Sequence, residues 1–252
     1  MTLEACAQLV ERGDRDRFFA AMAAQVEARK VLFPLYAFNL EVARAPWVTE
    51  EPLIAEMRLQ WWRDALEEIA KGGPVRRHEV TTPLSAILDP TLAPVLDQIV
   101  EARRWDISKE PFEDARTFEA YLEHTGGALM WAAAHSLGAP VSAAPAITGL
   151  GKANALVRYL RAVPELEARG RIPLIDGRPD AVATLARNAY GAVKENLSIY
   201  KELPMVVRGA LLEAWQTRPL LAQIISDPMR VANGDLGLSP FRSKLRLLMG
   251  RI

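Results

Sequence analysis

Apolar residues recur at three- and four-residue steps along almost the whole chain, and this helical period excludes most other fold classes. Strand signals are scarce, since the stretch "RIPLI" is short and is interrupted by Pro173. The loops are brief, and no linker rich in Gly or Ser divides the 252 residues. We therefore expect a single all-α domain over residues 1–252, a helical bundle around a central cavity or core.

Glycine, proline and capping residues predict where individual helices begin and end. Thr49, which two acids follow, is expected to cap a helix that stops at Gly72. Pro34 lies inside the apolar run from Phe18 to Phe38, so we expect a break or a kink near Leu32. Further helices are predicted at roughly 92–105, 114–137, 143–162, 180–201, 204–225 and 241–249.

Charge and cysteine content limit the classes of partner and the compartment. Lys plus Arg and Asp plus Glu number 31 each, so no net field draws the chain to nucleic acid. The only cysteine is Cys6, which excludes a disulfide framework. The first residues resemble neither a secretory signal nor a transit peptide, and no apolar run is long enough for a transmembrane helix. We expect a soluble, cytoplasmic protein with no nucleic-acid partner.

Three carboxylates, those of Asp64, Glu67 and Glu68, fall within one turn of a predicted helix. Oxygen ligands on one helical face suit Mg²⁺. Lys71 follows Glu67 and Glu68 by four and three residues, which is the spacing of ordinary surface ion pairs. The pattern therefore favours a solvated helix face over a metal site.

Three further motifs each allow two interpretations. The stretch "HTGGALMW" has two glycines inside a helix, which indicates the close approach of a neighbouring helix rather than of a ligand. Arg158 and Arg161 lie three residues apart, so their guanidinium groups either converge on one anion or pair with nearby glutamates. The C-terminal stretch "FRSKLRLLMGRI" mixes basic and apolar residues, a pattern that lies on an anionic membrane surface or covers the end of a bundle.

Four segments resemble, in the right order, helices of the squalene and phytoene synthase family. They are "RKVLFPLYAFN", "RLQWWRDAL", "YLEHTGGALM" and "LGKANALVRYLRAVPELEARGRIPL". The resemblance implies the all-α isoprenoid synthase bundle with its central cavity. It also implies the family's chemistry, in which two prenyl diphosphates are joined head to head with Mg²⁺ held by two aspartate-rich motifs.

The expected metal ligands are replaced in this sequence. In the positions of the family's aspartates stand Ala43, Arg44 and Trp47 in the first segment, and Ala162 and Leu166 in the second. Without these oxygens Mg²⁺ loses its ligand shell, so we expect a pseudoenzyme with no catalytic residue and no cofactor. The residues that shape the cavity or bind anions are retained, and with Arg158 they form the expected ligand-binding set: Tyr36, Phe38, Trp62, Tyr121, Gly127, Arg158, Arg161 and Arg171.

The strings "AFNLEVA" and "MRLQWW" resemble a divergent, non-catalytic branch of the family that includes a mitochondrial protein needed to assemble respiratory complex I. This implies a binding or assembly factor in the cytoplasm beside the inner face of the membrane. Its partners would be a respiratory complex subunit and an isoprenoid or phospholipid in the cavity. The alternative is an active prenyl diphosphate transferase whose Mg²⁺ ligands have moved to Glu41, Asp64 and Glu68.

Overall fold

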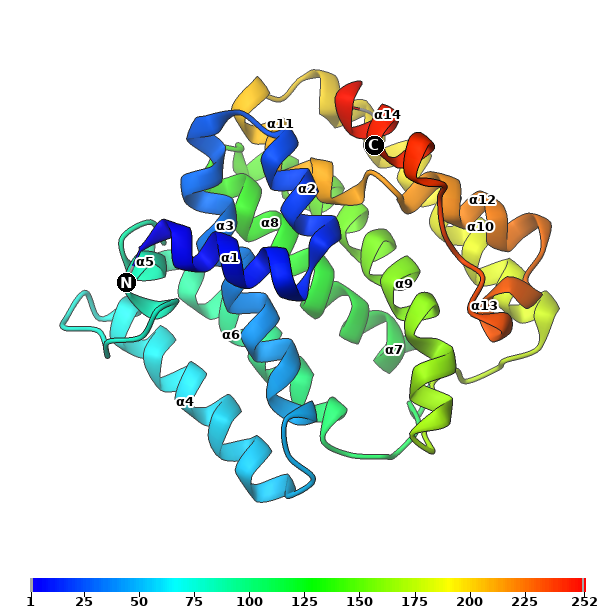
Figure 1. The fold of residues 1–252 in the computed structure, drawn as a ribbon, viewed down its shortest axis with the longest axis horizontal. Helices are drawn as coiled ribbons and strands as arrows, with labels where there is room; N and C mark the ends of the chain where they lie inside the picture. Colours follow the sequence, from blue (N-terminus) through cyan, green and yellow to red (C-terminus); the bar gives the residue numbers. More distant parts are fainter. Residues whose placement is uncertain (1, 251) are drawn as a thin grey trace.

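The computed structural model describes residues 2–250 and 252, and over these residues it contains helices and no strands (Figure 1). The all-α prediction is confirmed. One hydrophobic core cluster draws residues from Cys6 to Ile252 into the same interior. Within the described ranges, no helix combines the length and the apolar character that crossing a membrane requires.

Helix α3 (Val26–Arg44) lies at the centre, where it contacts α1, α2, α5, α6, α8 and α11. Apolar residues surround most of its circumference, as expected for a helix enclosed by others. The helix continues through Pro34, so of the break or kink expected near Leu32 the break does not occur. The carbonyl that loses its N–H partner there belongs to Lys30, which is exposed to solvent. The predicted run 18–38 is interrupted earlier instead, where Ala24 is extended.

The N-terminal corner consists of α1 (Leu3–Gly13), which the sequence analysis missed, and α2 (Arg15–Ala23). Cys6, Leu9 and Val10 bury one face of α1, which packs against α3. Asp14 ends α1 and caps α2, because its side chain accepts the backbone N–H of Arg17. This cap fixes both side chains at one end of the cavity described below.

The next helices cover the side of the bundle at the lower left of Figure 1. Thr49 accepts the N–H of Glu51 but does not cap the helix as predicted, because Pro52 begins it and Glu51 is the cap residue. Gly72, with a φ of 65°, allows the chain to leave the helix, as expected. The elements are η1 (Ala45–Trp47), α4 (Pro52–Ala70), α5 (Thr81–Ser85), η2 (Pro90–Leu92), α6 (Ala93–Ala102) and η3 (Arg103–Asp106).

A long helix crosses the core as α7 (Ala115–Leu122), the π-helical segment η4 (Glu123–Gly127) and α8 (Ala128–Ser136). The prediction for 114–137 is confirmed, with a capping box between Asp114 and Thr117. The glycine pair lies in η4 against α9: a Cβ on Gly126 would stand 2.6 Å from the Gly151 carbonyl oxygen. A neighbouring helix therefore accounts for the glycines, as the sequence analysis favoured.

Helix α9 (Ala144–Ala168) extends six residues beyond its predicted end at Ala162 and continues through Pro164. The predicted helix 204–225 is two helices, because η7 and a turn at Trp215 and Gln216 interrupt it. α10 and α12 pack against each other and against α9. The remaining elements are η5 (Val141–Ala143), α10 (Pro179–Asn196), η6 (Leu197–Lys201), α11 (Met205–Leu211), η7 (Leu212–Ala214), α12 (Thr217–Ser226), α13 (Met229–Asn233) and α14 (Pro240–Leu248).

Candidate functional site

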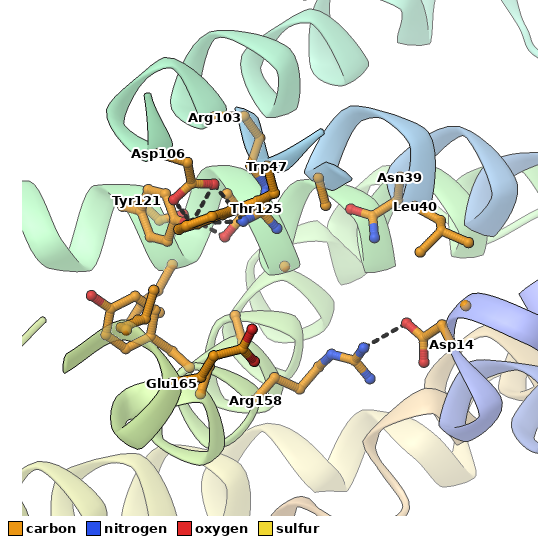
Figure 2. A pocket seen from close by; sticks show the side chains of 18 of the residues that line it. Asp14, Asn39, Leu40, Trp47, Arg103, Asp106, Tyr121, Thr125, Arg158 and Glu165 are labelled. Atoms are coloured by element: carbon orange, nitrogen blue, oxygen red, sulfur yellow. Dashed lines mark hydrogen bonds and ion pairs between the residues drawn. The ribbon is translucent and has the colours of Figure 1, made fainter. Parts of the chain in front are cut away.

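A cavity of about 400 Å³ opens between the α1–α2 corner, the C-terminal half of α3, η3, α7–η4 and α9. Figure 2 shows two polar groups at its two ends, Asp14 with Arg158 at one and Asp106 with Arg103 and Tyr121 at the other. The lining residues are Gly13, Asp14, Arg17, Asn39, Leu40, Ala43, Trp47, Arg103, Asp106, Tyr121, Leu122, Thr125, Gly126, Ala155, Arg158, Tyr159, Ala162, Glu165, Leu166 and Arg169.

Four of the five positions where the sequence lacks the expected aspartates face this cavity. Ala43 and Trp47 line it from the end of α3 and from η1, and Ala162 and Leu166 line it from α9. Arg44, the fifth, does not line it; its guanidinium lies 3.8 Å from the Glu41 carboxylate and is more than half exposed. Where the two helices face each other across the cavity, the side chains at these positions are therefore apolar.

The first polar end is a buried charge network. Arg17 donates to Glu213 Oε2 at 2.5 Å and to Asp14 Oδ2 at 2.9 Å, and Arg158 donates to the same Asp14 oxygen at 2.5 Å. Burial opposes ionisation of Asp14, but the charges of Arg158 and Arg17 outweigh it and lower the pKa of this carboxyl to about 2. Burial and the charge of Arg17 lower the pKa of Arg158. The network joins two arginines to two carboxyl groups.

Three buried oxygens beside this network have no hydrogen-bond partner among the described residues: those of Tyr36 (OH), Asn39 (Oδ1) and Glu213 (Oε1). The guanidinium of Arg17 lies 5.6 Å from the Tyr36 ring centroid. Burial, with the nearby Glu213 charge, raises the pKa of Tyr36, so the phenol is neutral and can donate. Asn39 is among the residues that line the cavity, although its amide oxygen is itself buried.

The second polar end joins η3 to α7. Tyr121 donates to Asp106 Oδ1 at 2.9 Å, and Arg103 donates to the Tyr121 hydroxyl at 2.6 Å and to Asp106 Oδ2 at 3.0 Å. Arg171 donates to the backbone carbonyls of Asp106 and Ser108 and stacks on Trp47, 4.7 Å from its ring centroid. Arg171 thus holds the loop after η3 in place through these two hydrogen bonds, and it does not line the cavity.

Of the expected ligand-binding residues, Tyr121 and Arg158 line the cavity. Phe38 and Trp62 are buried in the core, with ring centroids 5.4 Å apart. Arg161 is directed to Asp16, to which it donates at 2.8 Å, so it does not converge with Arg158 on one anion. The expected residues that do not line the cavity are Tyr36, Phe38, Trp62, Gly127, Arg161 and Arg171.

The alternative metal ligands are not brought together. Glu41 faces Arg44, whereas Asp64 and Glu68 lie 3.6 Å and 2.7 Å from Arg76 on another side of the bundle. Glu67 pairs with Lys71 at 2.6 Å, as its spacing indicated. Over the described residues, no group of three or more His, Cys, Asp or Glu side chains is arranged to hold a metal ion.

The carboxylates that do line the cavity also fit Mg²⁺ poorly. Asp14 lies between two arginines, Asp106 pairs with Arg103, and Glu165 pairs with Arg169 at 2.7 Å. Each of these three carboxylates is already paired with a cation, and the additional positive charge repels Mg²⁺. The residues present therefore do not fit the magnesium site that the family resemblance implies.

Sequence reasoning did not identify Asp14, Arg17, Asp106 and Glu213 as site residues. Asp14 gave a detectable signal, because an aspartate directly before a helical run is a typical N-cap. The partnership of Arg17 with Glu213 spans 196 positions and leaves no periodic pattern. Such a pair is visible only when the chain is folded.

The profile of the squalene/phytoene synthase family matches residues 10–174. The chain is 27% identical over 180 residues to NADH dehydrogenase (ubiquinone) complex I, assembly factor 6 of Homo sapiens, a match that covers 66% of this chain and 51% of the relative. It is 30% identical over 177 residues to the Drosophila melanogaster homolog of that factor, a match that covers 68% of this chain and 53% of the relative. The chain thus spans about half the length of the curated relatives it matches.

Two solved structures share the fold. A dehydrosqualene synthase crystal structure, determined with a ligand, superposes with a TM-score of 0.83 at 16% identity, covering 98% of this chain and 94% of that one. Squalene synthase HpnC from Alicyclobacillus acidocaldarius gives a TM-score of 0.74 at 14% identity, and the superposition covers 94% of this chain and 95% of that one. These likenesses confirm the isoprenoid synthase bundle predicted from the sequence. With the matched profile, which spans most of the cavity-forming helices, they lead to one conclusion: the chain belongs to the squalene/phytoene synthase family.

Proposed function

We propose that this protein is a non-catalytic member of the family that assists the assembly of respiratory complex I. The observation that carries the proposal is the cavity wall at Ala43, Trp47, Ala162 and Leu166. At these positions the two facing helices present apolar side chains where diphosphate chemistry needs carboxylates for Mg²⁺. A wall of this kind does not stabilise a leaving diphosphate, whereas it does suit the retention of an apolar chain.

The similarity to complex I assembly factors supports the assembly role. Five curated relatives with that name match about two thirds of this chain at 25–30% identity. We infer that the shared portion is the part of those proteins that recognises a partner during assembly. The proposal locates the protein in the cytoplasm, at the inner face of the membrane that holds the respiratory complex.

The cavity is proposed to hold one anionic, chain-bearing molecule, an isoprenoid or a phospholipid, without metal. Its lining carries four arginines, Arg17, Arg103, Arg158 and Arg169, against three carboxylates. Arginine binds phosphate directly and bidentately, so no metal bridge is required. Arg158 is the proposed head-group contact, because it lines the cavity and is about one-third exposed while Asp14 holds it in place.

Deletion of the gene in its host tests the assembly role. The proposal predicts less assembled complex I on native gels and slower NADH oxidation by isolated membranes, with both restored by the wild-type gene. A complementing gene that carries Arg158→Gln should restore less than one that carries Arg161→Gln, because Arg161 is directed away from the cavity to Asp16. Normal amounts of active complex I in the deletion strain would contradict the proposal.

A further inference from the structure

The C-terminal helix α14 (Pro240–Leu248) turns its apolar face away from the protein. Phe241, Leu245, Leu248 and Met249 stand at the spacing i, i+4, i+7 and i+8, so they lie on one side of the helix. Phe241 and Leu248 are 75% and 85% exposed, and Leu245 and Met249 are also exposed. In an ordinary surface helix this stripe faces the core. Here it faces solvent.

The opposite side of α14 attaches the helix to the bundle. Arg246 donates through Nε to the backbone carbonyl of Trp215 at 2.8 Å, and Leu247 packs against the hydrophobic core. Ser239 caps the helix by accepting the N–H of Arg242. The exposed stripe is therefore held in a fixed orientation on the surface, at the edge of the molecule where Figure 1 shows α14.

The charge around the stripe selects its partner. Arg242 and Lys244 are exposed, and helical geometry places them on the two flanks of the stripe. Residues 236–252 carry four basic side chains and no acidic one, although the whole chain has equal numbers of both. An apolar stripe flanked by cations matches an anionic bilayer, whose surface attracts Lys and Arg while its acyl region accepts Phe and Leu.

We propose that α14 docks the protein on an anionic lipid surface, with Phe241 and Leu248 inserted and with Arg242 and Lys244 at the head groups. This inference does not depend on the complex I role. An acidic flank would have argued for another partner. The exposed apolar residues at the start of α4, Leu53 and Met57, lack a purely cationic flank, since three acids, Glu50, Glu51 and Glu56, and one base, Arg58, stand beside them in the sequence.

Sedimentation of the full chain with lipid vesicles tests the proposal. Vesicles of phosphatidylcholine with phosphatidylglycerol are compared with vesicles of phosphatidylcholine alone, at low and high salt. The chain should partition onto the anionic vesicles, and salt should weaken the binding because the cations are at the surface. Arg242→Gln with Lys244→Gln should lower the partition coefficient about 25-fold, about fivefold for each cation.

A second pair of variants distinguishes insertion of the α14 stripe from nonspecific hydrophobic adsorption to the vesicles. Phe241→Ser with Leu248→Ser should lower the partition coefficient at least about tenfold. The matched control, Leu53→Ser with Met57→Ser, removes similarly exposed apolar side chains from α4 and should leave the partition coefficient unchanged. Circular dichroism confirms that each variant retains its helices.

Two results would overturn the proposal. One is equal partitioning of the α14 variants and wild type. The other is self-association of the wild type, lost in Phe241→Ser with Leu248→Ser, without binding to anionic vesicles, because the stripe would then bind a second copy of the chain.

Discussion

Arg17 and Glu213 lie 196 positions apart, yet they form an ion pair at 2.5 Å in which the Glu213 side chain has no solvent exposure and that of Arg17 has 6%. The pair fixes the α1–α2 corner to η7, which lies beyond the residues matched by the family profile. It thereby closes one end of the cavity with segments from both halves of the chain.

Glu213→Gln should destabilise the fold by roughly 3 kcal/mol, because it leaves the buried Arg17 charge with only Asp14 as a partner. The measurement is urea unfolding at neutral pH. Glu119→Gln is the control, since Glu119 pairs with Lys152 at the surface and its loss should cost less than about 1 kcal/mol. Equal effects of the two variants would show that the buried network does not stabilise the fold.

Stability should depend on pH through Asp14. Its pKa is lowered from 3.8 to about 2 in the folded protein, so the unfolded chain binds more protons between these values and stability rises with pH there. The contribution, about 2 kcal/mol, is fully present above about pH 4 and is lost as the pH falls through about 2. The difference in unfolding free energy between wild type and Asp14→Asn should therefore shrink as the pH falls from about 4 to about 2. A constant difference would contradict the assignment.

Gly151→Ala should destabilise the protein by more than about 2 kcal/mol, because the new Cβ would stand 2.5 Å from the Gly126 carbonyl oxygen where α9 crosses η4. Gly191→Ala, in α10, is the matched control. A Cβ at Gly191 meets no atom within 4 Å, so this change should stabilise the helix by about 0.5–1 kcal/mol. Thermal unfolding distinguishes the two, and a tolerated Gly151→Ala would show that the crossing is looser than described.

Ligand binding should distinguish Arg158 from Arg161, although both belong to the ligand-binding set expected from the sequence. Arg158→Gln should weaken the binding of an anionic isoprenoid or phospholipid about tenfold or more, because Arg158 lines the cavity. Arg161→Gln should change the affinity little, since Arg161 pairs with Asp16. Titration calorimetry with chelator present gives both affinities, and unchanged binding by Arg158→Gln would remove this residue from the proposed site.

Local signals in the sequence were sufficient for most of the fold. The 3.6-residue period predicted the long core helix at 114–137 to within a residue or two, and in the structure Asp114 caps it and Gly138, with a φ of 97°, follows its end. The local rules did not predict that α3 stays continuous at Pro34 or that α9 continues past Ala162 through Pro164, where both helices pack against several others. Helix α1 was missed, although the structure gives it a capping threonine and a buried face.

The candidate site was only partly predictable. The resemblance placed Ala43, Trp47, Ala162 and Leu166 at positions that do line one cavity. It also suggested Arg171 as an anion contact, yet this guanidinium is bonded to two backbone carbonyls and lies 92% buried behind the wall. The direction of a side chain and its contacts with residues far along the chain depend on the tertiary structure. The helical period of the sequence carries no information on either.

The proposal that the cavity binds a prenyl diphosphate without catalysis can be tested with the purified protein. Purified protein is incubated with farnesyl or geranylgeranyl diphosphate and Mg²⁺, and the mixture is analysed by mass spectrometry for a coupled hydrocarbon product. We expect no product, and we expect binding that is equal with and without chelator. A product that disappears when chelator is added would contradict the proposal, since the chain would then hold catalytic Mg²⁺ despite the apolar wall.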